Sequence, residues 1–200
     1  MVPLEKEGGE WHMNAEEFIK AVTEISKLKT TLRHCYTMPE RKESVADHSW
    51  RTAMMAMFLR KEESFLSVDM DRVIRMILIH DIGEIFTGDI PTFEKTQSDA
   101  KTEEKLYLDW IGDLPVSQRA EWFSLVQEME KMETAEARIY KALDKMEALI
   151  SHNESDLSTW LPLEYDLQFT YGQKEAQCNP MLSEVRRLID VWSTQKIREE

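Results

Sequence analysis

Apolar side chains recur at intervals of three and four residues over most of the chain, which is the spacing of one face of an α-helix. The first such segment begins at Asn14, whose side chain can cap a helix while Glu17 returns the contact three residues later. The apolar residues that follow at helical spacing predict one buried stripe, formed by Phe18, Val22, Ile25 and Leu28. Residues 1–13 combine adjacent glycines with mixed charges, so we expect a flexible N-terminal tail.

Two central helices are predicted in the next part of the chain. One begins near Ser44 and continues through VADHSWRTAMMAMFL, which is apolar on nearly every side, as in the middle of a helical bundle. The other begins after Asp69 or Asp71 and ends by Gly88, because Pro91 follows. Its run MILI is also compatible with a buried strand, but the length of the segment favours a helix.

The rest of the chain completes a helical pattern. Further helices are predicted at 98–112, 117–132, 134–151 and 182–196. We expect a loop at 32–43, which holds Pro39 and many charges, and mostly irregular structure at 153–179. Almost no segment alternates between apolar and polar residues as a strand does, and there is no glycine-rich phosphate loop. The sequence therefore predicts an all-α, single-domain helical bundle that spans residues 14–200.

Cysteine content and hydropathy indicate a cytoplasmic protein. A chain of 200 residues can bury a substantial core without disulfides, and Cys35 and Cys178 lack the spacing of a redox pair or a zinc knuckle. The N-terminus lacks the basic and apolar regions of a leader peptide. The longest wholly apolar run, Ala53–Leu59, is too short to cross a bilayer, so we expect no membrane partner.

The charge balance narrows the classes of ligand. With 25 basic and 38 acidic residues, the formal net charge is −13. This charge disfavours broad binding to nucleic-acid polymers or anionic membranes, although much of it also serves solubility. A small phosphate-bearing ligand would therefore need a local basic site.

The segment MILIHDIGEIFTGD places two ionisable groups directly after a buried apolar run. On a helix, the side chains of His80 and Asp81 point about 100° apart, so they can flank one point close to the helix wall. An imidazole and a carboxylate suit a divalent ion, with Mn, Fe, Co or Mg as well as Zn open on chemistry alone. An isolated His-Asp pair is common, but its place in a core helix favours a metal site, because burial is costly without partners.

A second histidine occurs in the same kind of setting. His48 lies inside the apolar helix that follows Ser44, whereas the other histidines outside the His80 helix lie near tails or loops. These are His12, His34 and His152. We therefore expect His48 to converge with His80 and Asp81.

Two acidic residues follow the His-Asp pair. Glu84 stands four residues after His80, on the same helix face, and can either activate a water molecule or orient the imidazole. Asp89 follows Gly88, where it can either reach back over the site or cap a turn.

These residues carry a resemblance to a known family. The order His48, His80-Asp81, Asp144 resembles the H…HD…D metal motif of HD-domain phosphohydrolases. MILIHDIGEIFTGDIPT is similar to a segment of their 5′-deoxynucleotidase branch, and LRHCYTMPERKESVADHS resembles the arginine-bearing loop of that branch. The match covers roughly residues 15–150, and the combined spacing is more specific than any one motif.

The resemblance implies a role for each matched residue. It makes His48, His80, Asp81 and Asp144 ligands of one divalent metal ion. Glu84 would activate or position water, Arg33 would grip the phosphate, and Asp89 would approach the sugar hydroxyl. Lys95 takes the place of a further phosphate-facing lysine. Nothing in the residues themselves selects Asp144 among the many acids of its helix.

The implied activity belongs to nucleotide metabolism. The enzyme would use one Co, Mn, Fe, Zn or Mg ion to remove the 5′-phosphate from deoxynucleoside 5′-monophosphates. One rival is a dNTP triphosphohydrolase, because related phage enzymes share the ligands and the arginine. Another is a non-catalytic helical module that binds metal or nucleotide, against which the combination of Arg33, Glu84 and Asp89 argues.

One substrate-binding position departs from the pattern. Enteric nucleotidases of this branch carry tryptophan after the arginine, whereas this chain has His34, which leaves base and sugar selectivity open. The adjacent Cys35 is either a reactive thiol or an inert buried one. The core motifs span 33–145 and do not account for a C-terminal extension, 153–200, which packs as a loop, covers the site or serves a homodimer interface.

Overall fold

A computed structural model describes residues 13–38 and 40–199. The predicted flexible tail, 1–13, therefore lies outside the described residues except for Met13. The boundary between tail and domain stays a prediction.

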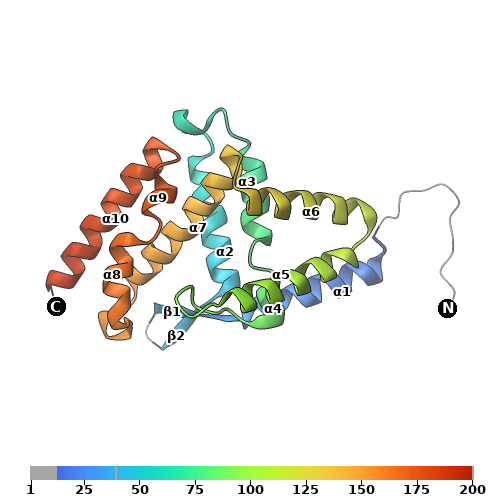
Figure 1. Cartoon of the computed structure of the whole chain (residues 1–200), viewed down its shortest axis with the longest axis horizontal. Helices are drawn as coiled ribbons and strands as arrows, with labels where there is room; N and C mark the ends of the chain where they lie inside the picture. Colours follow the sequence, from blue (N-terminus) through green and yellow to red (C-terminus); the bar gives the residue numbers. More distant parts are fainter. Residues whose placement is uncertain (1–12, 39, 200) are drawn as a thin grey trace, which may run out of the picture.

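Helices dominate the described chain and confirm the all-α fold class (Figure 1). In order they are α1 (Ala15–Ile25), α2 (Val45–Leu59), α3 (Met70–Ile79), α4 (Glu84–Thr87), α5 (Gln97–Gly112), α6 (Val116–Lys131), α7 (Ala135–Glu154), α8 (Pro162–Thr170), α9 (Gln173–Ala176) and α10 (Pro180–Glu199). Short 3-10 turns occur at Ser26–Lys29, Glu63–Phe65 and Leu157–Thr159. Among the described residues, no helix is both long and apolar enough to span a membrane.

Polar caps fix where the first helices begin. Asn14 caps α1 and Ser44 caps α2, as their sequences predict. In each case the third helical residue accepts a hydrogen bond from the cap's own backbone N–H, at 2.8 Å for Glu17 and 3.0 Å for Asp47. These reciprocal bonds satisfy N–H groups that a helix end otherwise leaves without partners.

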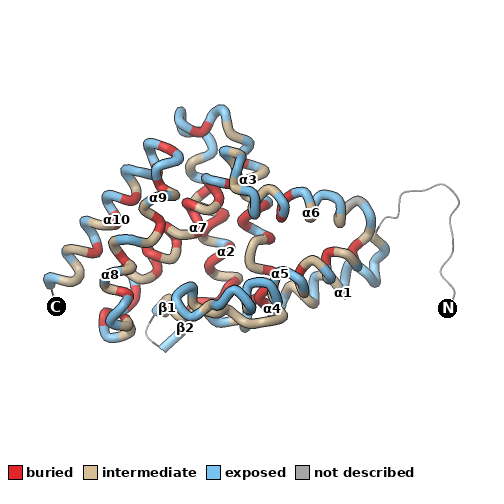
Figure 2. Tube along the Cα trace, in the orientation of Figure 1, coloured by how far each residue is buried: buried red, intermediate tan, exposed pale blue. Residues whose placement is uncertain are grey.

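The core surrounds α7, which packs against α2, α3, α6, α9, α10 and the β-hairpin described below. Figure 2 shows buried residues along much of α7 and α2, near the middle of the molecule. The fully buried apolar side chains include Phe65, Met76, Ile77, Ile111, Leu125, Leu143, Met146 and Leu182. This packing makes α7 a rigid support for any side chain on its surface.

Two apolar faces are more exposed than their patterns predict. In α1, Phe18 is 53% exposed and Val22 is 41% exposed, so the prediction of one buried stripe is wrong for this helix. Helix α2 is central on only one face, because Trp50 and Phe58 on its other side are 66% and 76% exposed. Periodicity identifies an apolar face but does not say what covers it.

A β-hairpin replaces the loop expected at 32–43. Strand β1 (Leu32–Met38) pairs antiparallel with β2 (Arg41–Ser44), and the connecting residue Glu40 has a φ of +65°. The strand signal in LRHCYTM was missed because the segment is short and half of its positions are polar. The hairpin matters for the site because β1 packs against α7 and carries Arg33.

The helix expected to continue to Gly88 is interrupted. Helix α3 ends at Ile79, residues 80–83 form turns, and α4 follows. In this turn the Glu84 N–H donates to the Asp81 carbonyl at 3.0 Å. A Cβ atom on Gly83 would lie 2.9 Å from Cγ of Glu103, so glycine allows α5 to pack closely against the turn.

The C-terminal extension is regular, which corrects the expectation for 153–179. The end of α7, a 3-10 turn and helices α8 and α9 together occupy most of this segment, and Pro162 stands in the first turn of α8, where a proline is favourable. The fully buried Arg186 of α10 joins the helices, because its guanidinium donates to the Gln168 carbonyl at 2.9 Å and the Tyr171 carbonyl at 3.3 Å. Helix α8 is therefore held firmly beside α7.

Candidate active site

The structure brings the four predicted metal ligands to one point. His48 comes from α2, His80 and Asp81 from the turn that follows α3, and Asp144 from α7. Oδ1 of Asp144 lies 3.1 Å from Nε2 of His48 and 3.5 Å from Nε2 of His80. Oδ2 of Asp81 lies 3.8 Å from Nε2 of His48 and 2.9 Å from Nε2 of His80. Their convergence is a structural fact, whereas their role as ligands stays a prediction.

The donor atoms fit a divalent transition metal. Nδ1 of His80 lies 2.7 Å from the Ile77 carbonyl, which accepts only from a protonated nitrogen and so leaves a lone pair on Nε2. That buried Nε2 has no hydrogen-bond partner among the residues that the structure describes. Two imidazole nitrogens and two carboxylates around a common point are a suitable ligand set.

Glu147 supports His48 from behind and was missed in the sequence. The carboxylate of this fully buried residue contacts Nδ1 of His48 and accepts from Nε of Arg51 at 2.6 Å. Burial alone raises the pKa of Glu147, but the nearby positive groups outweigh it and lower that pKa to about 2. Its one signal is the spacing of three residues after Asp144, which places both carboxylates on the same face of α7.

Arg33 lies beside the same point. Its Nε donates to Oε2 of the buried Glu43 at 3.1 Å, and its Nη1 lies 3.7 Å from Oδ2 of Asp81. Burial lowers the pKa of Arg33, but the negative charges of Glu147, Asp81 and Glu43 raise it by more than burial lowers it. The guanidinium therefore stays charged. Glu43 was also missed in the sequence.

Glu84 and Asp89 face the cleft near Arg33 and Asp81. Glu84 is 6% exposed, and its Oε2 has no hydrogen-bond partner among the described residues. Burial, with the charges of Asp81 and Asp89, raises the pKa of Glu84 to about 10. Burial also raises the pKa of Asp89, while Arg33 opposes that rise. A cation beside Glu84 would favour its ionised form.

Two lysines add positive charge. The predicted phosphate-facing Lys95 lines the cleft but donates from Nζ to Oε2 of Glu103 at 2.7 Å. Lys141, which was missed in the sequence, lies one turn before Asp144 and donates to its Oδ2 at 2.8 Å. These lysines and Arg33 place positive charges in the cleft beside its acidic residues.

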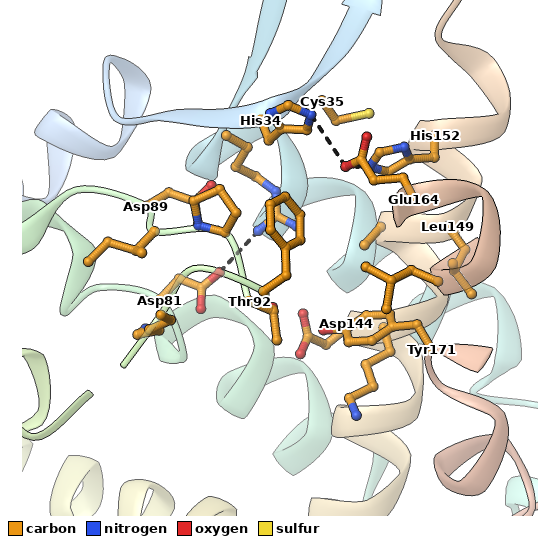
Figure 3. Close-up of a pocket in the computed structure, with 18 of the residues that line it drawn as sticks. His34, Cys35, Asp81, Asp89, Thr92, Asp144, Leu149, His152, Glu164 and Tyr171 are labelled. Carbon is orange, nitrogen blue, oxygen red and sulfur yellow. Dashed lines mark ion pairs between the residues drawn. The ribbon is translucent and has the colours of Figure 1, made fainter. Parts of the chain in front are cut away.

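Asp81, Asp144 and the charged groups around them line one cleft of about 610 Å³ (Figure 3). Its polar lining includes Arg33, Asp81, Glu84, Asp89, Lys95 and Asp144. Phe93, Leu149, Leu167 and Tyr171 supply an apolar wall, and two of these residues lie in or next to α8. A cleft of this size and mixed character suits a small organic ligand with a charged end.

His34, which differs from the tryptophan of the family pattern, and the adjacent Cys35 also line this cleft. Nε2 of His34 is 3.3 Å from Oε1 of Glu164, a residue of α8 for which the sequence gave no functional signal. The Cys35 thiol is buried, and burial raises its pKa to about 12. The inert interpretation of this cysteine therefore holds.

Comparison with known proteins places the chain in a family. A family model described as "HD domain" matches residues 25–186. A 5′-deoxynucleotidase HDDC2 of Dictyostelium discoideum is 34% identical over 149 residues, which cover 70% of this chain and 77% of that protein. The human 5′-deoxynucleotidase HDDC2 is 31% identical over 140 residues, which cover 69% of this chain and 66% of the human protein.

A solved structure agrees with these matches. A protein described as a predicted metal-dependent phosphohydrolase from Magnetospirillum magnetotacticum superposes with a TM-score of 0.74 at 34% identity. The superposition covers 90% of this chain and 94% of that one. Because the family model spans most of the sequence and the fold agrees, the chain belongs to the HD-domain family.

Proposed function

We propose that this protein is a metal-dependent 5′-deoxynucleotidase that converts deoxynucleoside 5′-monophosphates into deoxynucleosides and phosphate. The main support is the convergence of the four predicted ligands, His48, His80, Asp81 and Asp144. Asp81 and Asp144 line a cleft together with Arg33 and Glu84. The names and identities of the relatives support this reaction and substrate class.

His48, His80, Asp81 and Asp144 would hold one divalent ion. The bound ion would lower the pKa of a water molecule and offset the charge of the phosphoryl group. Co, Mn, Fe, Zn and Mg all remain compatible with two imidazoles and two carboxylates.

The surrounding residues divide the remaining work. Arg33, held by Glu43, presents its guanidinium to the phosphate oxygens. Ionised Glu84 accepts a proton from the attacking water as oxygen bonds to phosphorus, and the bond from phosphorus to O5′ breaks as O5′ takes up a proton from solvent. Asp89 contacts the sugar hydroxyl. Lys95 contacts the phosphate after its ion pair with Glu103 breaks.

Phosphate release from dAMP tests this proposal. The metal-loaded protein should release free phosphate from dAMP and little or no tripolyphosphate from dATP. Tripolyphosphate from dATP without phosphate from dAMP would instead establish the triphosphohydrolase activity. A protein that binds metal and nucleotide but hydrolyses neither would be the non-catalytic module.

We also infer a cytoplasmic homodimer. The two cysteines are free, and Phe18, Ile19 and Val22 on α1 form an exposed apolar face that a second copy could cover. Light scattering after size exclusion should give twice the chain mass of 23.6 kDa, whereas the chain mass itself would contradict the dimer.

A further inference from the structure

A second group of histidines and a carboxylate lies in the cleft, away from the proposed metal ligands. His34 comes from β1, His152 from the last turn of α7 and Glu164 from the first turn of α8. Figure 3 shows the three side chains gathered beside β1, while Asp81 and Asp144 lie toward the opposite side of the cleft. We call the first three residues the histidine–glutamate cluster.

Glu164 is the centre of this cluster. Its side chain is 5% exposed, and its Oε2 accepts a hydrogen bond from the Leu161 N–H at 2.6 Å, which caps α8. Its Oε1 lies 3.3 Å from Nε2 of His34 and 3.5 Å from Nε2 of His152. Capping accounts for one oxygen only, and the other faces the cleft-lining histidines.

The cluster retains unused hydrogen-bonding capacity. The contact of Oε1 with the His34 ring is not a well-aligned hydrogen bond, because His34 Nε2 is buried without a partner among the described residues. His152 Nδ1 is likewise buried and unpartnered within the described chain. Unpaired buried polar atoms are costly unless a ligand or water satisfies them.

The unpartnered Nδ1 of His152 is available as an acceptor. An ionised carboxylate can only accept, so the ring nitrogen of His152 that faces it carries the proton and leaves a lone pair on Nδ1. Burial lowers the pKa of His152, which favours the neutral ring that has one donor and one acceptor. Glu164 opposes that decrease, whereas His34 and Arg33 reinforce it.

A second metal ion does not fit this cluster. Among the described residues, three or more ligating atoms within 4.8 Å of one another occur at His48, His80 and Asp81, and at Glu43, His48 and Glu147. The histidine–glutamate cluster does not meet that condition. It is therefore better suited to hydrogen bonding with an organic ligand.

Apolar groups next to the cluster would accept a flat ring. The Phe93 ring meets the His34 ring edge to face, with centroids 6.1 Å apart. Leu149, Leu167 and Tyr171 line the same cleft. A heterocycle between these side chains would bury its faces against apolar atoms and direct a polar edge toward Glu164.

We propose that the histidine–glutamate cluster selects the nucleobase of the substrate, and that Glu164 accepts a hydrogen bond from an exocyclic amino group. Deoxynucleotides with an amino group at this position, such as dCMP, are then preferred over those with a keto oxygen, such as dUMP. A keto oxygen would face a carboxylate oxygen and leave both acceptors unpaired. The assignment rests on the proposed function, because the metal end fixes where the phosphate lies.

The pair dCMP and dUMP isolates this contact, because the two substrates share the same sugar and phosphate. With the metal-loaded full chain, kcat/KM should be about tenfold higher for dCMP, the effect of one good hydrogen bond. Glu164→Gln should bring the ratio close to one, because its amide can donate to the keto oxygen. Glu17→Gln is a matched control, because Glu17 caps α1 in the same way but does not line the cleft.

Binding measurements separate the two proposals. Equal kcat/KM values for dCMP and dUMP in the unmodified protein would overturn base selection but not the proposed nucleotidase activity. A preference for dCMP that survives in folded Glu164→Gln would have the same consequence. If neither substrate releases phosphate, calorimetric titration decides. Tighter binding of dCMP than dUMP, lost in Glu164→Gln, would then support base selection, and equal binding would overturn it, while phosphate release from dAMP tests the nucleotidase separately. The ratio in the unmodified protein remains decisive even if the variant fails to fold.

Discussion

The cleft contains two groups of histidines and carboxylates that differ in which ring nitrogen is occupied. At the metal end, Nδ1 of His80 meets a carbonyl and Nδ1 of His48 meets Glu147, so both Nε2 atoms converge on Asp144. In the histidine–glutamate cluster a carboxylate oxygen also faces both Nε2 atoms, but Nδ1 of His152 has no hydrogen-bond partner among the described residues. The same residue types thus suit metal binding in one place and hydrogen bonding in the other, because the backbone and second partners orient the rings differently.

Loss of a proposed ligand should have the largest effect at the metal end. Asp144→Ala should release the ion and reduce phosphate release by about three orders of magnitude or more. Metal content by mass spectrometry and activity on dAMP measure the two effects. Asp109→Ala is the matched control, because Asp109 also pairs with a lysine of its own helix but is exposed. Full metal occupancy in Asp144→Ala would disprove the four-ligand assignment.

Removal of the proposed base should separate chemistry from metal binding. Glu84→Gln should keep the metal and reduce kcat by about a hundredfold to a thousandfold, because the amide cannot accept the proton from water. Steady-state kinetics with parallel metal analysis tests this expectation. Glu121→Gln, at an exposed pair with Arg75, should leave both values unchanged. Unchanged phosphate release in Glu84→Gln would exclude the catalytic role.

Substitution of Glu147, which contacts Nδ1 of His48, tests whether the orientation of His48 matters for metal binding. Glu147→Gln should weaken metal affinity by about tenfold to a hundredfold, because the amide holds the imidazole less strongly than a carboxylate. Competition with a chelator of known affinity measures the change. Glu154→Gln is a close control, since Glu154 also pairs with Arg51 but does not contact His48. Equal effects of the two substitutions would attribute the loss to Arg51.

The smallest expected effect concerns the dependence of stability on pH. The folded-state pKa of His152 is lowered, chiefly by burial, so the unfolded chain binds the proton more readily. This residue therefore reduces stability as the pH falls below the ordinary histidine pKa. His152→Gln should flatten that part of the profile, measured by urea denaturation at several pH values. A steeper loss of stability at low pH in the variant would contradict the sign.

The sequence predicts the metal end better than the other end of the cleft. His48 and His80 stand out because they interrupt strongly apolar helices, whereas Asp144 was identified only through the family resemblance. Glu147 is one acid among many, and its contact with His48 joins residues 99 positions apart, a relation that local periodicity cannot encode.

The missed regions are short and depend on tertiary packing. The hairpin was missed because its polar positions face the cleft and the solvent, so it lacks a clear strand pattern. Helix α8 was missed because PLEYDLQFT is short and its polar residues Glu164 and Gln168 are buried. Both segments line the substrate side of the cleft, where buried polar groups replace the apolar pattern of a core helix.

Because Arg186 attaches α8 to α10, the choice of substrate and the hydrolysis depend on different elements of the fold. The proposed metal ligands lie on α2, on α7 and in the turn after α3, whereas Glu164 lies on a helix that Arg186 joins to the C-terminal helix α10. Substitutions in α8 can therefore change which deoxynucleotide is preferred while the proposed metal ligands stay unchanged. In this arrangement the C-terminal helices affect the choice of substrate without contributing any of the proposed metal ligands.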